Sequence, residues 1–327
     1  MLKNDVEAIS KKEGRLVGTD SHDLARDYIV ARLQTIGAKP YEGNSLVLPY
    51  DSNGLNFFNV VGSIPGSNPG LDPILLGAHY DTCGAKPGAD DNAAAVAILL
   101  STAEKLVGAK HERTVILAFF DAEEPPFFLD PSKMGSIRLY YDHGLHNVHI
   151  AIIMDLVGHD VPIPNLEDVL FITGMESDPG LQTIIRAIEP ERGLRTVPTL
   201  NSYLEFDLSD HHIFRVHGHP YLLLTCGRWE HYHSVTDTPD KLNYQKMNHV
   251  RDYVLTLIDQ ISVKSLLRPS ERAIPESVPE YDTLQTELYF LKKNIQPTLA
   301  AFGQDINLRS REDIDKLVAL LLQRFNL

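Results

Sequence analysis

Cysteine and long apolar runs are scarce in this chain. The 327 residues include only two cysteines, Cys83 and Cys226. This count excludes a disulfide framework, although a single bridge is compatible with it. No apolar run reaches the roughly 18 residues that a membrane-spanning helix requires, and the N-terminal sequence MLKNDVEAISKKEGR has no apolar segment typical of a signal peptide. We therefore expect a soluble protein with no membrane partner and favour the cytoplasm as its compartment.

Positive charge is also in short supply. Lysine and arginine together number 30 against 44 aspartates and glutamates, which gives a formal net charge of −14 and a pI near 5.4. An acidic chain without a Lys/Arg-rich run is a poor ligand for nucleic acid or for an anionic membrane surface, so we expect neither as a partner. Hydrophobic residues make up 43% of the chain, which allows one large α/β domain or two smaller ones.

Short apolar runs alternate with amphipathic segments along the chain. Continuous apolar runs are typical of strands that are buried on both faces of a sheet. Such runs and related patterns predict strands at residues 45–50, 57–64, 73–81, 114–120, 148–158, 169–174 and 219–225. Helices are expected within 4–36, from near Asn92, and at about 134–143, 179–189 and 244–264. This alternation predicts an α/β fold with a mixed, mostly parallel central sheet flanked by helices.

The second N-terminal helix shows clear end signals. We expect it to be capped at Asp20 or Ser21 and to end at Gly37. Its predicted core-facing residues are Leu24, Tyr28, Ile29, Ala31 and Leu33. The preceding loop, residues 13–21, shows no obvious chemistry of its own.

The stretch GAHYDTCGAKPGADDN, residues 77–92, joins a predicted strand to a predicted helix, where open α/β sheets place their sites. It carries His79, Asp81, Asp90 and Asp91. Imidazole and carboxylate groups bind dications such as zinc, and one carboxylate can bridge two ions. On an extended segment the Asp81 carboxylate would lie on the same side as His79 and could hold its second imidazole N–H. The alternative is an acidic loop with a buried structural histidine.

Three further predicted strands run into candidate ligands at their C-terminal ends: Glu123 with Glu124, then Asp155, then His233. Adjacent acids are usually solvated, and a single loop histidine is usually a surface residue. A carboxylate at the end of a buried strand is nevertheless costly unless it is paired or bound to metal. Together these groups favour a two-metal hydrolase. A serine or cysteine nucleophile is disfavoured, because no G-x-S-x-G motif occurs and neither cysteine has a recognised catalytic context.

Separated blocks of the sequence follow the order of a known family. GAHYD, PGADDN, FFDAEE, MGS, MDLVG, SDH and YHSVTDTPDKL resemble the signature of the zinc aminopeptidases of metallopeptidase family twenty-eight. Members of that family include glutamate carboxypeptidases, and its relatives include the glutaminyl cyclases. The resemblance extends from about residue 14 to residue 264. It implies a mixed sheet between helices, with two zinc ions per chain beyond the strand ends.

The resemblance also implies a set of metal ligands. His79 and Asp155 are expected to hold one zinc ion, and Glu124 and His233 the other. Asp91, the second acid of ADDN, is expected to bridge the two ions. Two neighbouring dications lower the pKa of a shared water toward 7 and stabilise the charge that develops during amide hydrolysis.

Further roles follow from the same resemblance. Glu123 is expected to be the general base, Asp81 to orient His79, and Tyr232 to polarise the scissile carbonyl. Asp210, in the SDH block, is a candidate for orienting groups around the metals or the substrate. Because Cys83 follows the HYD motif closely, modification of its thiol is expected to affect the site.

The implied activity is that of a zinc-dependent aminopeptidase acting on peptides with a free N-terminus. A glutaminyl cyclase on the same scaffold is the first alternative, and it would use Asp91, Glu124 and His233 around a single zinc ion. A catalytically silent receptor or scaffold is the second. The intact ligand set together with Glu123 argues against that second alternative.

A Pro-, Ser- and charge-rich stretch interrupts the chain after the last expected strand and helix. It predicts a linker at 267–281 between a catalytic domain at 1–266 and a C-terminal helical extension at 282–327. The extension reads as a helical hairpin. It either packs on its own domain, or serves as a homo-oligomer contact or a lid over the site.

Overall fold

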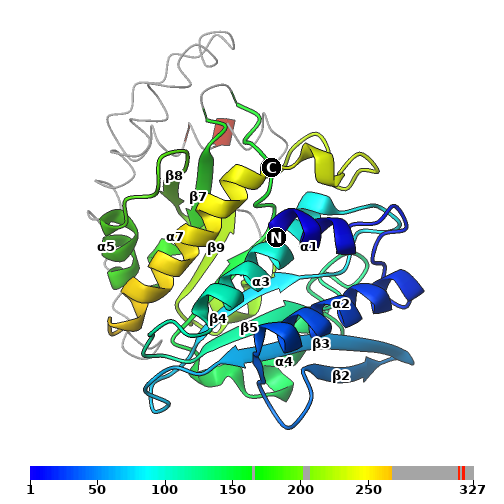
Figure 1. The fold of residues 1–327 in the computed structure, drawn as a ribbon, viewed down its shortest axis with the longest axis horizontal. Helices are drawn as coiled ribbons and strands as arrows, with labels where there is room; N and C mark the ends of the chain where they lie inside the picture. Colours follow the sequence, from blue (N-terminus) through cyan, green and yellow to red (C-terminus); the bar gives the residue numbers. More distant parts are fainter. Residues whose placement is uncertain (164–165, 202–206, 267–315, 317–318, 321–327) are drawn as a thin grey trace.

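Among the residues that the structure describes, nine strands form one central sheet. The structure is a computed structural model that describes residues 1–163, 166–201, 207–266, 316 and 319–320 (Figure 1). The strand order is β1-β3-β5-β4-β6-β9-β7-β8, and β2 pairs with β3. The strands are β1 (Lys39–Pro40), β2 (Val47–Ser52), β3 (Leu55–Ile64), β4 (Ile74–His79), β5 (Val115–Phe120), β6 (Ile150–Met154), β7 (Val169–Thr173), β8 (Arg195–Thr199) and β9 (Tyr221–Thr225). The neighbours β5, β4, β6 and β9 run parallel, and antiparallel pairs extend the sheet on both sides.

Helices cover both faces of this sheet. One face packs against α1 (Leu2–Ile9), α2 (Asp20–Ile36), α3 (Ala95–Leu106), α5 (Pro179–Ala187) and α7 (Tyr244–Ser262). The other packs against α4 (Gly135–Asp142) and α6 (His212–Val216). Figure 1 shows α1, α3 and α7 lying side by side over the strands. The predicted mixed sheet flanked by helices is therefore confirmed.

The two helical layers explain the continuous apolar runs. In β5, Val115, Leu117 and Phe119 belong to one core cluster, whereas Ile116, Ala118 and Phe120 belong to the other. Both sets are buried, so every position of the strand must be apolar. Polar side chains can therefore appear only where such a strand ends, at the edge of the sheet.

Two expectations for the N-terminal helix α2 are wrong. Its cap is Thr19, which accepts a hydrogen bond from a backbone N–H of the first turn, and not Asp20 or Ser21. Leu24 is 70% exposed and Ala31 is also exposed. The buried apolar residues instead follow the helical repeat at Ala25, Ile29, Leu33 and Ile36. The predicted stop at Gly37 is confirmed, since Gly37 has a φ of 89°.

The strands β1 and β8 were not expected from the sequence. β1 has two residues, and β8 reads RTVPT, in which a proline and polar residues hide the strand pattern. Both lie at the ends of the strand order. Edge strands of this kind need no continuous apolar run, because in the described sheet one side of each carries no partner strand.

The linker and the helical extension predicted for residues 267–327 lie outside the described residues, apart from Lys316, Ala319 and Leu320. Their domain boundaries and their contribution to oligomerisation therefore stay predictions. Within the part of the chain that the structure describes, no helix combines the length and the apolar character needed to cross a bilayer.

Candidate active site

The parallel strands deliver the predicted site residues to one edge of the sheet. His79 is the last residue of β4, and Asp155 directly follows β6. Glu123 and Glu124 come shortly after β5, and His233 lies in the segment after β9. Since the carboxyl ends of parallel strands meet at the same edge, these side chains converge there. The structure thus brings together the residues that the sequence analysis named at the strand ends.

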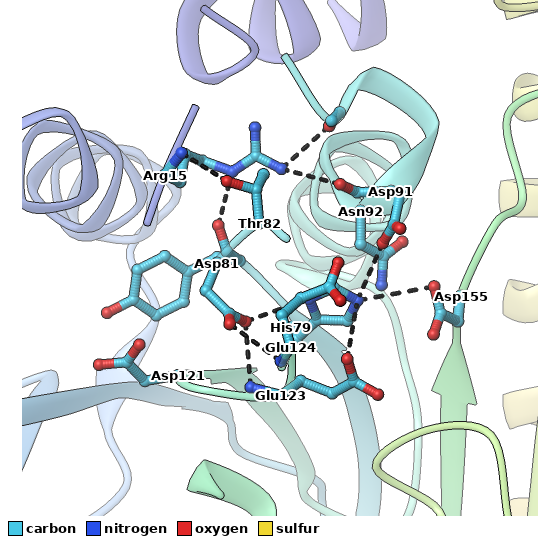
Figure 2. Close-up of polar contacts among 12 residues, drawn as sticks. Arg15, His79, Asp81, Thr82, Asp91, Asn92, Asp121, Glu123, Glu124 and Asp155 are labelled. Atoms are coloured by element: carbon cyan, nitrogen blue, oxygen red, sulfur yellow. Dashed lines mark hydrogen bonds and ion pairs between the residues drawn. The ribbon is translucent and has the colours of Figure 1, made fainter. Parts of the chain in front are cut away.

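Asp91 lies between the two histidines. Its Oδ1 is 3.4 Å from His79 Nε2, and its Oδ2 is 3.1 Å from His233 Nε2. His79 Nε2 is also 3.6 Å from Asp155 Oδ1, and His233 Nε2 is 3.0 Å from Glu124 Oε2. Figure 2 shows the side chains of Asp91 and Asp155 directed toward the His79 ring. The residues thus form two clusters that share one carboxylate.

The clusters have the composition of a zinc centre. Several of their buried polar atoms have no partner in hydrogen-bond geometry: His79 Nε2, Asp91 Oδ2, Glu124 Oε1, Asp155 Oδ1 and His233 Nε2. Unpaired buried polar atoms are rare, because each loses its hydration without compensation. Imidazole nitrogens and carboxylate oxygens that converge at these separations are the donors zinc prefers. The residues present therefore fit this metal.

The charge balance of the site also indicates a cation. Burial and neighbouring Asp91 raise the pKa of Glu124 to about 8, and burial raises the pKa of Asp210 to about 7. Burial and neighbouring acids also raise the pKa values of Glu123 and Asp155. Acids in this environment either bind protons or neutralise a metal ion. A dication at the site would compensate the buried negative charge and displace the protons.

Asp81 supports both clusters at once. Its Oδ1 is 3.2 Å from His79 Nδ1, as the sequence predicted. The same carboxylate accepts hydrogen bonds from the backbone N–H groups of Glu123, at 3.1 Å, and Glu124, at 3.0 Å. One side chain therefore sets the orientation of His79 from β4 and the backbone position of the two acids after β5 (Figure 2).

We expect Asp81→Asn to lower zinc affinity by roughly 10- to 100-fold, the usual effect of losing a carboxylate behind a metal-binding histidine. The asparagine amide has one acceptor oxygen, whereas Asp81 accepts three hydrogen bonds. Competition with a chromophoric chelator measures the change. Asp51→Asn, an exposed side chain on β2, is the matched control. An Asp81→Asn variant with the zinc affinity of the control would contradict this assignment.

A buried polar network positions the backbone of Asp91. Asp237 accepts hydrogen bonds from the N–H groups of Asp90, at 2.9 Å, and Asp91, at 3.1 Å. The Asp90 carboxylate accepts a hydrogen bond from the Gly158 N–H at 2.7 Å and pairs with His159 Nδ1 at 2.6 Å. The loop after β4 is therefore tied to the segments after β6 and β9. Of the adjacent acid pair, Asp91 faces His79 and His233, whereas Asp90 faces Gly158 and His159.

Arg15 was missed by the sequence reasoning, which assigned no chemistry to its loop. The side chain is completely buried. Its guanidinium donates to the carbonyls of Tyr80 at 2.6 Å, Pro87 at 2.8 Å, Gly88 at 2.9 Å and Asp91 at 3.3 Å. Figure 2 shows the guanidinium directed toward Asp91. Burial lowers the pKa of Arg15 to about 10, opposed mainly by Asp91, so it stays charged at neutral pH. This cation holds the loop that carries Asp91.

The backbone around the site is strained in three places. Five non-glycine residues of the described chain have a positive φ, and three of them adjoin the site: Ala122 (54°), Leu156 (53°) and His233 (52°). Such conformations cost roughly 1–3 kcal/mol each and concentrate at functional sites. Each lies at or next to a predicted ligand or the predicted base.

Tyr232 packs against the second cluster. Its ring stacks on His233 with a centroid separation of 3.8 Å, and the Arg228 guanidinium lies 4.9 Å from the Tyr232 ring centroid. Burial and the nearby Asp91 raise the pKa of Tyr232. The phenol therefore stays protonated and can donate a hydrogen bond.

Comparison with curated proteins finds relatives with partial coverage. The uncharacterised protein YfbL of Escherichia coli (strain K12) is 30% identical over 214 residues, which is 57% of this chain and 66% of YfbL. A vacuolar membrane protease of Schizosaccharomyces japonicus is 31% identical over 135 residues, 37% of this chain and 16% of that protein. The chain thus spans less than two thirds of the length of either relative.

Solved structures share the fold. A glutaminyl cyclase of Porphyromonas gingivalis superposes with a TM-score of 0.62 at 20% identity, covering 79% of this chain and 96% of its own. A leucine aminopeptidase precursor of Bacteroides thetaiotaomicron gives 0.61 at 21% identity, with 79% and 95% coverage. A zinc-dependent exopeptidase of Parabacteroides distasonis gives 0.61 at 19% identity, with 80% and 97% coverage.

The sequence model of peptidase family M28 matches residues 59–258. This span is more than half of the chain. It contains the four parallel central strands and both clusters from His79 to His233. The chain therefore belongs to peptidase family M28.

Proposed function

We propose that the protein is a zinc-dependent aminopeptidase that removes N-terminal residues from peptides. The observation that carries this proposal is the position of Asp91 between two histidine–carboxylate clusters, with Glu123 beside them. His79 and Asp155 would hold one zinc ion, Glu124 and His233 a second, and Asp91 would bridge the two. Bound zinc would lower the pKa of a water molecule and polarise the scissile carbonyl.

Glu123 is the candidate general base. It is 4% exposed, and its Oε2 lies 3.8 Å from His79 Nε2. The backbone N–H of Glu123 donates a hydrogen bond to Asp81, which fixes the position of the Glu123 main chain. Burial raises its pKa well above the ordinary value for glutamate. A carboxylate with a raised pKa suits a group that accepts a proton from water and returns it to the leaving amine.

Tyr232 would assist on the carbonyl side. Since its hydroxyl stays protonated, it can donate a hydrogen bond to the substrate oxygen on which negative charge develops. Preorganised donors of this kind commonly contribute about 10²–10³ in rate. The ring of Tyr232 is held by its stack on His233 and by Arg228.

A glutaminyl cyclase is the second candidate, because Asp91, Glu124 and His233 form a complete ligand set for one zinc ion. Part of the chain is 28% identical to a glutaminyl-peptide cyclotransferase of Drosophila melanogaster, over 165 residues. A cyclase needs no activated water, since the substrate's own amine attacks its side-chain amide. The His79–Asp155 cluster, braced by Asp81, favours the aminopeptidase because it adds a second metal position.

Metal stoichiometry combined with paired assays distinguishes the two candidates. We expect two zinc ions per chain, cleavage of a leucyl anilide, and no ammonia release from an N-terminal glutaminyl peptide. The same anilide with an acetylated amine should not be cleaved, because an aminopeptidase requires a free N-terminus. One zinc ion, an intact anilide and ammonia release would reject the aminopeptidase in favour of the cyclase.

A further inference from the structure

Cys83 lies beside the second metal cluster. It is half-buried in the loop between β4 and α3. Its Sγ and the nearest ligand atoms of Glu124 and His233 all lie within 4.8 Å of one another. Asp91 lines the same pocket. A thiol, two carboxylates and an imidazole therefore meet at one point of the molecule.

The pocket also contains an acceptor without a partner among the described residues. Glu124 is 3% exposed, and its Oε1 has no hydrogen-bond partner there. An unpartnered carboxylate oxygen this deeply buried indicates a missing positive charge or donor. The Cys83 sulfur lines the same pocket and accepts a hydrogen bond from Lys86 Nζ at 3.8 Å. This long contact leaves sulfur lone pairs able to bind an ion placed between Glu124 and His233.

The surroundings argue against Cys83 as a reactive nucleophile. Burial and Glu124 raise the pKa of its thiol above the ordinary value, with Lys86 acting in the opposite direction. Reactive cysteines instead have depressed pKa values in electropositive surroundings. A thiol in an acidic pocket is suited to a different role, since a dication deprotonates a thiol that coordinates it.

We propose that Cys83 is a ligand of the metal ion held by Glu124 and His233. This inference rests on the metal centre of the proposed function. Asp91, Glu124 and His233 supply three donors, and a thiolate would add a fourth. Water or substrate would then take a fifth position, a coordination number that zinc also reaches in catalytic sites. The sulfur–metal bond forms as the thiol proton is released to solvent. A sulfur donor is softer than nitrogen or oxygen. This position should therefore bind the soft ion Cd²⁺ more tightly than a site with only nitrogen and oxygen donors would.

Cobalt substitution tests the sulfur ligand directly. The full-length protein is stripped with a chelator and titrated with Co²⁺, while bound cobalt is counted by elemental analysis. We expect a sulfur-to-cobalt charge-transfer band in the near ultraviolet. Cys83→Ser should bind cobalt and lose the band. Cys226→Ser is the matched control, because Cys226 is the other free cysteine and belongs to none of the candidate metal clusters found among the described residues; it should keep the band.

Proton release gives a second readout that does not depend on activity. In weakly buffered solution, the wild-type protein with both metal positions filled should release about one more proton per chain than Cys83→Ser, because one coordinated thiol per chain is deprotonated. If the wild-type protein bound cobalt without showing the band, the assignment of Cys83 as a ligand would be wrong, whereas the proposed metal centre would still stand. Persistence of the band in Cys83→Ser would also overturn that assignment. If the wild-type protein bound no cobalt, both the assignment of Cys83 as a ligand and the proposed metal centre would be wrong.

Discussion

Replacing Glu123 with glutamine is expected to lower kcat by about 10²–10⁴-fold, which is the usual contribution of a positioned general base. This corresponds to about 3–5 kcal/mol of transition-state stabilisation. Glutamine has the same shape but does not accept the proton of the attacking water. The backbone N–H of residue 123 still donates to Asp81, so the loop and the two clusters should keep their geometry. Hydrolysis of the leucyl anilide and zinc content are measured on the same samples.

The neighbouring acid provides the contrast for this prediction. Glu124→Gln should reduce zinc affinity, because Glu124 Oε2 lies 3.0 Å from His233 Nε2 within the second cluster. Glu123→Gln should leave zinc content unchanged. Near-normal turnover in a zinc-loaded Glu123→Gln protein would show that another group is the base. Loss of zinc in that variant would instead make Glu123 a ligand.

The pKa values of Glu124 and His233 predict how zinc affinity depends on pH. Burial raises the pKa of Glu124 to about 8. Burial opposes the charged form of His233, but the neighbouring carboxylates of Asp91 and Glu124 outweigh this effect and raise its pKa to about 9. Without metal, this pair therefore binds protons at neutral pH. Zinc must displace those protons, so zinc affinity should fall as the pH is lowered.

Strand positions and candidate ligands could be predicted because their signals are local. An apolar run such as the one ending at Phe120 requires cover on both faces, and the polar residues after it can lie only at the sheet edge. His79 and Asp81 are two positions apart on one strand, so their contact follows from strand geometry. The family resemblance supplied the pairing of ligands across different strands, which local patterns do not contain.

The network behind the ligands could not be predicted in this way. Arg15 contacts the Tyr80 carbonyl 65 positions along the chain, and Asp237 contacts the Asp90 N–H 147 positions away. Every residue carries a backbone carbonyl, and all except proline carry an N–H. The residue types along the sequence therefore do not indicate which backbone group a buried side chain will contact. The same holds for Leu24, whose exposure depends on how α2 is rotated against the sheet.

Asp91→Asn is expected to reduce occupancy of both metal positions together and to abolish activity. The two carboxylate oxygens of Asp91 face different histidines, at 3.4 Å and 3.1 Å. Burial opposes its ionisation, but the neighbouring imidazoles of His233 and His79 outweigh this effect and hold its pKa below the ordinary value, so it is ionised at neutral pH. Asparagine has one acceptor oxygen and no charge, and it therefore cannot bridge two dications. Zinc content after dialysis against buffered zinc measures the effect.

The adjacent Asp90→Asn is the matched control, because it removes a buried carboxylate one position away. Asp90 faces Gly158 and His159 instead of the histidine ligands. The asparagine amide keeps an acceptor for the Gly158 N–H but loses the charge beside His159. We expect this variant to lower the free energy of unfolding by up to about 3 kcal/mol, the range for hydrogen bonds to charged groups, while keeping its zinc. Thermal denaturation in saturating zinc separates stability from metal loss. If Asp91→Asn kept one full equivalent of zinc, Asp91 would serve one position only, and the bridging assignment would have to be abandoned.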